Sequence, residues 1–467
     1  MTNISALQSA LSGLLAQRQR LDVIGHNVAN VATPGYSRQR ADLVSGGGGP
    51  APALFSGSLL TGDGVDVAGI SRYRDEFLET RSLGERAATA QLGLQSRYLE
   101  RIELVHTEPS DNGLSAGLDA LWSSFDELAN HPGQLPQRTA VLEQADATID
   151  QFRFMDDQMR TLRASAVGEA TALVTQANDL AKEVASLNDA LRPLLLSGAS
   201  PNDLLDQRDV AVGRLTDLVG GRVQNRDDGT IDVYVGGSTV VAGGRTLELG
   251  VATVPDAGLA DVGMPRLAFS FAGGGEASPT GGEAAGLLEM ANNAIPDAIR
   301  SLDRVANTLV TSVNALHTTG QDLDGATGWN FFESTGTTAA TLAMSSDVVD
   351  QPRRIAIATV GAGQLDADVG QRLAALRDAV DGPDGQYLEL VGGLGVQVGS
   401  ARVRASAQES VLRRVDEQRL SARAVNIDEE MIDLVSAQRA YEASARMINA
   451  VDEMLDILVN RLGLVGR

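Results

Sequence analysis

Apolar residues recur at alternating spacings of three and four at both ends of this chain, over residues 4–28 and again over residues 427–462. The N-terminal stripe contains Leu7, Leu11, Leu14, Leu21, Ile24 and Val28. The C-terminal stripe contains Met431, Leu434, Tyr441, Ile448, Leu455 and Leu462. Narrow stripes of this kind let helices pair along their sides, and a single amphipathic helix is barely stable alone in water. We predict that the terminal helices pair as a coiled coil or pack against neighbouring subunits. The plainer alternative is that each packs on the core of its own domain.

Helical periodicity also fills most of the chain between these ends. Proline and glycine turn signals separate the predicted helices, which cover residues 74–106, 114–131, 138–196, 202–219, 283–317 and 395–424. Ser200 is expected to cap the helix at 202–219, with Pro201 at its first position. Asn426 is expected to cap the last helix, with Glu429 reaching back to the same end. The fold is therefore predicted to be mainly α.

The periodicity changes from helical to alternating at Gly220. Apolar residues then recur at every second position around two hairpin signals, Asp228-Gly229 and Gly236-Gly237. This pattern ends near residue 282 and predicts a β domain inserted between helices. Closer to the N-terminus, residues 37–68 are rich in glycine with a few alternating valines, which predicts an extended segment or a hairpin.

These patterns predict a nested organisation in three parts. Residues 1–36 and 425–467 form a terminal coiled-coil domain. Residues 37–219 and 283–424 form a domain of bundled long helices, with an extended connector near residues 37–73. Residues 220–282 form a small outer β domain. Because the first and last helices associate, they are expected to fold after the segments between them.

Composition and charge narrow the range of partners. The chain has 467 residues, of which 43% are hydrophobic and 21% charged, and this composition suits several globular domains. A formal net charge of −23 argues against a nucleic-acid partner, since phosphate binding needs basic surfaces. No stretch of about 18 apolar residues is present to cross a membrane, so no membrane insertion is expected. The N-terminus lacks the features of a cleaved secretory signal, so an exported chain would leave by another route.

Candidate chemical motifs are few. Cysteine is absent, which excludes disulfides, thiolate metal sites and cysteine nucleophiles. The four histidines are far apart and are expected to have surface or capping roles. Residues 322–333 resemble a calcium-binding loop but lack its glycine, and are expected to form a turn with solvated carboxylates. Acidic pairs such as Glu429 and Glu430 are expected to be solvated or ion-paired. We therefore predict no catalytic residue, no cofactor and no metal.

The strings around the two helix ends are the most distinctive part of the sequence. LDVIGHNVANVATPGYSRQR, at residues 21–40, resembles the N-terminal signature of bacterial flagellar rod, hook and hook-associated proteins. The residues that carry this resemblance are Asn27, Ala29, Asn30, Thr33, Pro34, Gly35 and Tyr36. NIDEEMIDLVSAQRAYEASARMINAVDEMLDIL, at residues 426–458, resembles the matching C-terminal signature, notably at Glu430, Met431, Gln438, Tyr441, Ala443, Ile448 and Asp452. In the middle, LLDQRDVAVGRL and NALHTTGQDL are similar to the hook-associated branch of this family.

The resemblance implies a structural protein of the flagellum, exported by the flagellar type III apparatus without a cleaved signal peptide. It implies the first junction ring between hook and filament, on which the filament assembles outside the cell. The implied partners are other copies in the ring, hook subunits below, the second junction protein above and an export chaperone. The terminal coiled coil is implied to line the export channel. Asn27 and Asn30 are implied to satisfy backbone groups where the first helix ends, with Pro34 and Gly35 setting its exit angle.

Two other functions stay open. Another axial protein, such as the hook subunit or the second junction protein, would share both ends of the chain. An enzyme carried by the flagellum, such as a wall hydrolase, would need a cleft with paired carboxylates.

Overall fold

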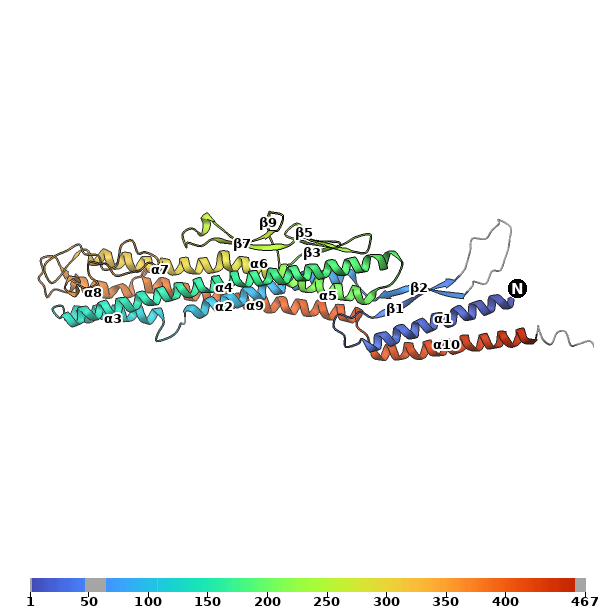
Figure 1. Ribbon diagram of the computed structural model, residues 1–467. Helices are drawn as coiled ribbons and strands as arrows, with labels where there is room; N and C mark the ends of the chain where they lie inside the picture. The colour runs from blue at the N-terminus through green and yellow to red at the C-terminus, as the bar shows by residue number, and fades with distance from the viewer. Residues whose placement is uncertain (1, 47–63, 107, 458–467) are drawn as a thin grey trace, which may run out of the picture.

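A computed structural model describes residues 2–46, 64–106 and 108–457, with side chains from residue 6 onward. Leu462, which was predicted to lie on the C-terminal stripe, is outside these residues. Figure 1 shows a long helical bundle, a layer of strands along one side and the two terminal helices beyond one end. The described chain is mainly helical with small sheets, as the sequence predicts.

The bundle combines long and short helices. The long helices are α2 (Glu76–His106), α4 (Leu135–Leu196), α7 (Ile295–His317) and α9 (Pro383–Arg423). The short helices are α3 (Leu114–Asn130), α5 (Asn202–Val219), α6 (Gly282–Glu289) and α8 (Asp368–Ala374). Helices α2 and α7 each pack against both α4 and α9. Therefore α4 and α9 lie on opposite sides of the bundle.

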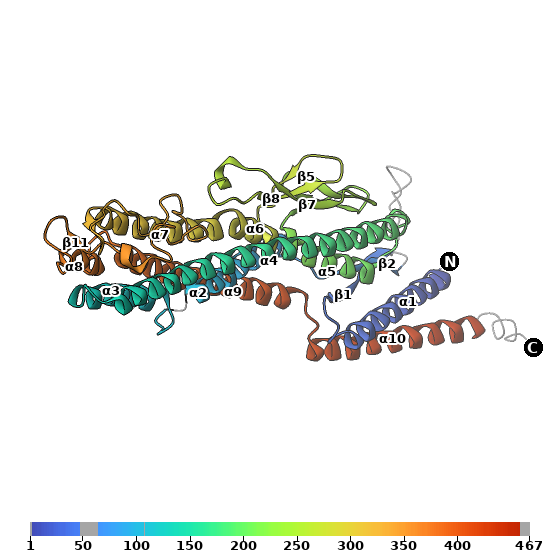
Figure 2. The ribbon, with the colours of Figure 1, turned by 60° about the vertical axis from the view of Figure 1, so that its left-hand side comes forward.

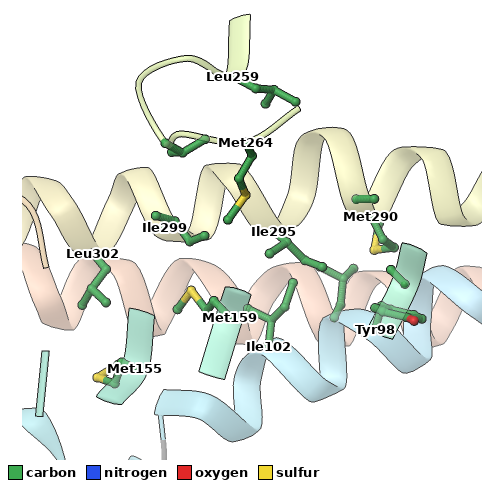
Figure 3. Close-up of a cluster of buried hydrophobic side chains, with 14 of the residues drawn as sticks. Tyr98, Ile102, Met155, Met159, Leu259, Met264, Met290, Ile295, Ile299 and Leu302 are labelled. Atoms are coloured by element: carbon green, nitrogen blue, oxygen red, sulfur yellow. The ribbon is translucent and has the colours of Figure 1, made fainter. Parts of the chain in front are cut away.

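The core uses aliphatic and methionine side chains because aromatic residues make up only 4% of the chain. Figure 3 shows Ile102 of α2, Met155 and Met159 of α4, and Ile295 and Leu302 of α7 converging on one another. Leu259 and Met264, from a loop above α7, lie over the same cluster. Unbranched methionines fill irregular space between helices, so this core stays closely packed with few rings.

The helix predicted over 283–317 is interrupted. α6 ends at Glu289, and a π-helical turn, η2 (Met290–Ala294), precedes α7. Pro296 accounts for the change, since a proline inside a helix removes an amide donor and crowds the carbonyl four residues earlier. The freed carbonyl of Ala291 accepts a hydrogen bond from Arg163 of α4, at 2.9 Å. This hydrogen bond attaches the irregular turn to α4.

The predicted start of α9 and the predicted cap of α5 are wrong. α9 begins at Pro383, twelve residues before the predicted start at residue 395, because glycines at several early positions weaken the helical pattern. The early part is fixed by Trp122, whose indole donates to Asp384 at 2.8 Å. Ser200 does not cap α5. Its hydroxyl instead accepts from the amide of Ile70 at 3.2 Å, and Pro201 precedes the first helical residue.

Strands β3 to β9, which we call the β layer, lie over α4 and α6 (Figure 1). One antiparallel sheet contains β3 (Arg222–Asn225), β4 (Ile231–Val235), β5 (Ser238–Ala242) and β6 (Arg245–Thr246), in that order. A second contains β7 (Leu249–Val254), β8 (Arg266–Phe271) and β9 (Glu276–Ala277). In β4 the side chains of Ile231, Val233 and Val235 are buried and the two between them are half-buried. This alternation places one face of the first sheet on the helices.

Helical asparagines attach the β layer to the bundle. Asn188 of α4 donates to the carbonyl of Ile231 at 2.9 Å and accepts from its amide at 3.2 Å. Asn178 makes the same pair of bonds with Leu249, and Asn292 makes it with Leu267. Each amide side chain thus pairs with an extended residue as a neighbouring strand would.

Replacing Asn188 with leucine is expected to lower the free energy of unfolding by about 2–3 kcal/mol, because buried backbone groups of Ile231 and Gly243 lose their partner. Urea unfolding followed by circular dichroism measures this loss. Asn293→Leu, at an exposed position of the η2 turn, is the matched control and should change stability by less than about 0.5 kcal/mol. Equal effects of the two substitutions would show that the asparagine pairing contributes nothing.

Irregular chain between α7 and α8 closes the end of the bundle that lies away from the terminal helices. It contains β10 (Gly320–Gln321), β11 (Ala358–Thr359) and η3 (Pro352–Arg354). His317 holds it in place: its Nδ1 donates to the carbonyl of Trp329 at 2.7 Å, and its Nε2 accepts from the amide of Ala356 at 2.8 Å. His317 and His106 are both buried, so the prediction of surface or capping roles is wrong for these two.

Burial lowers the pKa of His317 from 6.5 to about 4. The native chain therefore keeps this ring neutral while the unfolded chain protonates it, so stability falls as the pH drops from 6.5 towards 4. Between about pH 7.5 and pH 5 this effect amounts to about 2 kcal/mol. His317→Gln should remove that part of the pH dependence in urea unfolding at the two pH values. His131→Gln, at the exposed end of α3, should retain it; the same slope in both variants would contradict this assignment.

Candidate assembly site at the terminal helices

The two terminal helices lie side by side and run in opposite directions (Figure 1, Figure 2). α1 spans Thr2–Ala29 and α10 spans Ile427–Asp456. The side chains buried in this region are mostly small: Ala10, Ala16, Val23, Ile24, Ala437 and Val451. Close approach continues at Gly13, where an added Cβ would lie 3.2 Å from Ser444 Oγ. Small residues therefore set the spacing between these helices.

The predicted stripe residues lie along this contact but are incompletely covered. Ile24 is buried. The half-buried members are Leu7, Leu14, Leu21, Val28, Leu434, Tyr441, Ile448 and Leu455. Leu11 and Met431 are 49% and 48% exposed. The buried alanines were not among the predicted residues, because alanine between leucines adds little to a hydrophobic pattern.

α10 is apolar on a second side as well. Its exposed apolar residues at helical spacing are Ile432, Val435, Ala443, Met447, Ala450 and Met454. This outer apolar side lies away from the one that holds Ala437 and Val451, and Ile432 is 71% exposed. A single neighbour, α1, cannot cover both sides of one helix. An exposed apolar stripe of this length is typical of a surface that binds other chains.

Asn27 organises the base of the terminal pair. Its amide nitrogen donates to the carbonyl of Gln39 at 2.9 Å and to Glu430 at 3.0 Å. Its oxygen accepts from the amide of Gln39 at 2.9 Å and from the hydroxyl of Tyr36 at 2.8 Å. Burial, and then the carboxylates nearby, raise the pKa of Tyr36 well above its ordinary value, so the phenol remains a donor. One side chain thus joins the end of α1, the following strand and the start of α10.

Arg38 completes this group. It donates from Nε to Glu430 at 2.6 Å and from Nη1 to Glu429 at 2.7 Å, and its Nη2 lies 3.5 Å from Asp433. Glu430 is 1% exposed in its side chain, whereas Glu429 is 57% exposed. Burial alone would lower the pKa of Arg38, but the bonds to Glu429 and Glu430 outweigh it and raise the pKa. We call Asn27, Tyr36, Arg38, Gln39, Glu429 and Glu430 the root cluster.

The root cluster is tied to the bundle through α5 and a hairpin. Strands β1 (Gln39–Gly46) and β2 (Gly64–Arg72) pair antiparallel and pack on α1. Asp206 of α5 accepts from the amide and hydroxyl of Ser37, at 2.9 and 2.8 Å, and from Arg72 at 2.7 Å. The terminal pair is therefore connected to the bundle by oriented polar contacts.

The turn after α1 contains the remaining N-terminal signature residues. Asn30 donates to the carbonyl of His26 at 3.0 Å, and Thr33 donates its hydroxyl to Asn30 at 3.0 Å. Pro34 is exposed. Gly35 has φ of 86°, and a Cβ there would clash with the side chain of Val210, so only glycine fits. Gln438 is exposed on α10 and lies outside the root cluster.

Several residues of this site were not predicted from the sequence. Arg38, Gln39 and Asp206 carry its contacts, yet each looks like an ordinary polar residue in the sequence. Glu429 was predicted to reach back and cap α10. It does not do so, because it pairs with Arg38. Asn426 does cap α10, accepting from the amide of Asp428 at 3.0 Å.

The turn at residues 322–333, which resembles a calcium-binding loop, is organised by Asp322. Asp322 accepts from the amides of Asp324 and Ala326, both at 2.8 Å, and from Trp329 at 2.9 Å. It is buried, so the expectation of a solvated carboxylate is wrong for Asp322. Over the described ranges, no group of three or more histidines and carboxylates is placed to hold a metal. Among those same residues, no helix combines the length and hydrophobicity needed to span a bilayer.

Comparison with known proteins agrees with this arrangement. Residues 99–332 match the family described as flagellar hook-associated protein FlgK helical domain. Residues 7–36 match the flagella basal body rod protein family, and residues 417–462 match the flagellar basal body rod FlgEFG protein C-terminal family.

Two relatives match this chain along nearly their whole length. The flagellar hook-associated protein 1 of Bacillus subtilis is 26% identical over 502 residues, covering 99% of each chain. That of Salmonella typhimurium is also 26% identical, covering 98% of this chain and 99% of the relative. The flagellar hook junction protein FlgK from Burkholderia pseudomallei has a similar fold, with a TM-score of 0.61 and 15% identity over 73% of this chain and all of that one. The helical-domain match spans half of the sequence, and the chain therefore belongs to the flagellar hook-associated protein FlgK family.

Proposed function

We propose that this chain is the structural subunit of the first junction ring between hook and filament, on which the filament assembles. The observation that carries this proposal is the outer apolar side of α10, which α1 leaves uncovered. In a ring, the terminal helices of neighbouring copies would bury that side. The polar contacts of the root cluster would hold the terminal pair at a fixed orientation while they do so.

The proposed arrangement has three layers. Residues 1–36 and 425–467 would pair as a coiled coil and line the export channel. The helical bundle, from residues 37–219 and 283–424, would surround them, and residues 220–282 would face outward. Export through the flagellar type III apparatus suits such a chain, since terminal helices that are stable only when packed can be exported unfolded and ordered on arrival.

The proposed partners follow from this position. They are other copies of the chain in the ring, hook subunits below, the second junction protein above and an export chaperone inside the cell. Neither nucleic acid nor membrane insertion is part of the proposal. The role is structural rather than catalytic.

The main rival is another flagellar axial protein, such as the hook subunit or the second junction protein. The two ends of the chain do not separate these possibilities, because their matches are to rod-type families. The helical domain at residues 99–332 favours the first junction protein, as do relatives that match along their whole length.

Immunogold electron microscopy of isolated hook–filament complexes tests the location. Antibody raised against the whole chain should label one narrow zone where the hook meets the filament. The control is a strain in which a functional relative from another bacterium replaces this gene. Its complexes assemble without this chain and should not be labelled. Label along the whole hook or along the filament would contradict a junction role.

A further inference from the structure

The side of α9 that faces away from the bundle is apolar and uncovered. Leu388, Val396 and Val403 recur at helical spacing and are 63%, 73% and 70% exposed. Glu389, next to Leu388, is the single acidic residue at positions 388–408, although the chain carries a net charge of −23. Arg404 and Arg414 are exposed on the same helix, and neither has an ion-pair partner among the described residues. This side is thus apolar with a positive charge at its edge.

Glycines make the same side of α9 flat. Gly392, Gly393, Gly395 and Gly399 lie within it, and a Cβ added at any of them would meet nothing within 4 Å. Glycine inside a helix is destabilising compared with alanine, and nothing in the chain itself requires it here. Together with the exposed valines, the glycines leave room for a large side chain of another molecule.

The outer side of α4 has the complementary character. Phe154 is 61% exposed there. Four exposed carboxylates share its side of the helix: Glu143, Asp146, Asp150 and Asp157. Among the described residues none of the four has an ion-pair partner, although Arg153 lies nearby. This side therefore offers one aromatic ring surrounded by negative charge.

The two sides lie at the same level along the bundle and face in opposite directions. Arg402 of α9 is 3.1 Å from Glu100 of α2, which is close to Ile102. Met159 of α4, five residues after Phe154, lies beside Ile102 from the side of α4 (Figure 3). Since α4 and α9 are separated by α2 and α7, one copy cannot bring its own two sides together. A second copy placed alongside can do so.

We propose that the outer side of α9 in one copy docks on the outer side of α4 in its neighbour, with Phe154 seated against the glycines. This contact rests on the proposed ring. It specifies which surfaces of neighbouring bundles meet in that ring. Two different surfaces of one chain meet head to tail, as a closed ring requires. The charges favour this occupant, because the basic edge of α9 meets the carboxylates of α4.

Disulfide trapping tests the contact on assembled material, since the chain has no cysteine of its own. Double variants combine Val396→Cys or Val403→Cys with Phe154→Cys or Asp150→Cys, and each replaces the wild-type copy in cells. Hook–filament complexes are isolated, mildly oxidised and run on a non-reducing gel. We expect dimers and longer multimers from the double variants and monomers from each single variant. The pair Val396→Cys with Gln176→Cys, farther along α4, is the matched control and should stay monomeric.

Other outcomes would overturn the contact. Double variants that are present in the complexes but remain monomeric would do so, and so would multimers from the control pair alone. A benzophenone attached to the Val396→Cys thiol identifies the neighbour directly: an adduct with α4 of a second copy supports the contact, and an adduct with another flagellar protein contradicts it. Absence of the wild-type chain from the complexes would instead overturn the proposed function, and the contact with it.

Discussion

Replacing Glu430 with leucine is expected to lower the free energy of local unfolding of α10 by about 3–5 kcal/mol. This is the usual effect of removing one partner of a buried ion pair. Glu430 is 1% exposed in its side chain and accepts from Arg38 at 2.6 Å and from Asn27 at 3.0 Å. Without it, a half-buried guanidinium and a buried amide lose their main partner. Because these contacts join α10 to the end of α1 and to β1, the effect should concentrate in the terminal pair.

Hydrogen exchange followed by mass spectrometry measures this loosening. Amides of α10 should exchange at least about 100-fold faster in the variant, while amides of α4 keep their wild-type rates. Glu429→Leu is the matched control, since it removes the neighbouring carboxylate from the same arginine. Its side chain is 57% exposed, so the loss should be within about 1 kcal/mol. Equal acceleration in both variants, or acceleration spread over the bundle, would contradict the role given to the root cluster.

Replacing Ile432 with aspartate is expected to abolish filament growth without destabilising the isolated chain. Ile432 is 71% exposed, and exposed substitutions usually change stability by less than about 0.5 kcal/mol. In an assembled ring the same position would be buried, where an unpaired carboxylate costs several kcal/mol. That cost corresponds to a decrease in subunit association of about 100-fold or more.

Two measurements separate these effects: urea unfolding of the purified variant, and filaments counted per cell by electron microscopy. Asn449→Asp introduces the same charge at an exposed position on the polar side of α10, and cells carrying it should grow filaments normally. Normal filaments with Ile432→Asp would mean that the outer apolar side stays exposed in the assembly. A large loss of stability in the purified variant would mean that Ile432 already packs within the single chain.

The main helices could be predicted from the sequence because their apolar periodicity is long. The predicted end of α2 at residue 106, and both ends predicted for α5, agree with the structure. The predicted start of α9 was wrong, because glycines occupy its early exposed side and no helical pattern favours glycine. The break between α6 and α7 was not predicted, because the apolar periodicity continues across Pro296.

The polar contacts could not be predicted, for a different reason. Arg38 and Glu430 are separated by 392 residues, so no local pattern links them. Asn188 looks like a weak helix former in the sequence, and its partners are backbone groups of strands elsewhere in the chain. His317 was expected to have a surface or capping role, because the residues next to it in the sequence give no sign of the loop that covers it. The family resemblance implied that Asn27 satisfies backbone groups near the end of α1, and its side chain pairs with the amide and carbonyl of Gln39.

Deletion of the gene, followed by electron microscopy of the cell surface and an assay for filament subunits in the medium, is the decisive test of the junction role. We expect intact hooks without filaments, together with monomeric filament protein shed outside the cells, and restoration of filaments by the wild-type gene. Cells without hooks would place the chain in the rod or hook, and cells with normal filaments would show that it forms no necessary junction; either result would contradict a role at the junction.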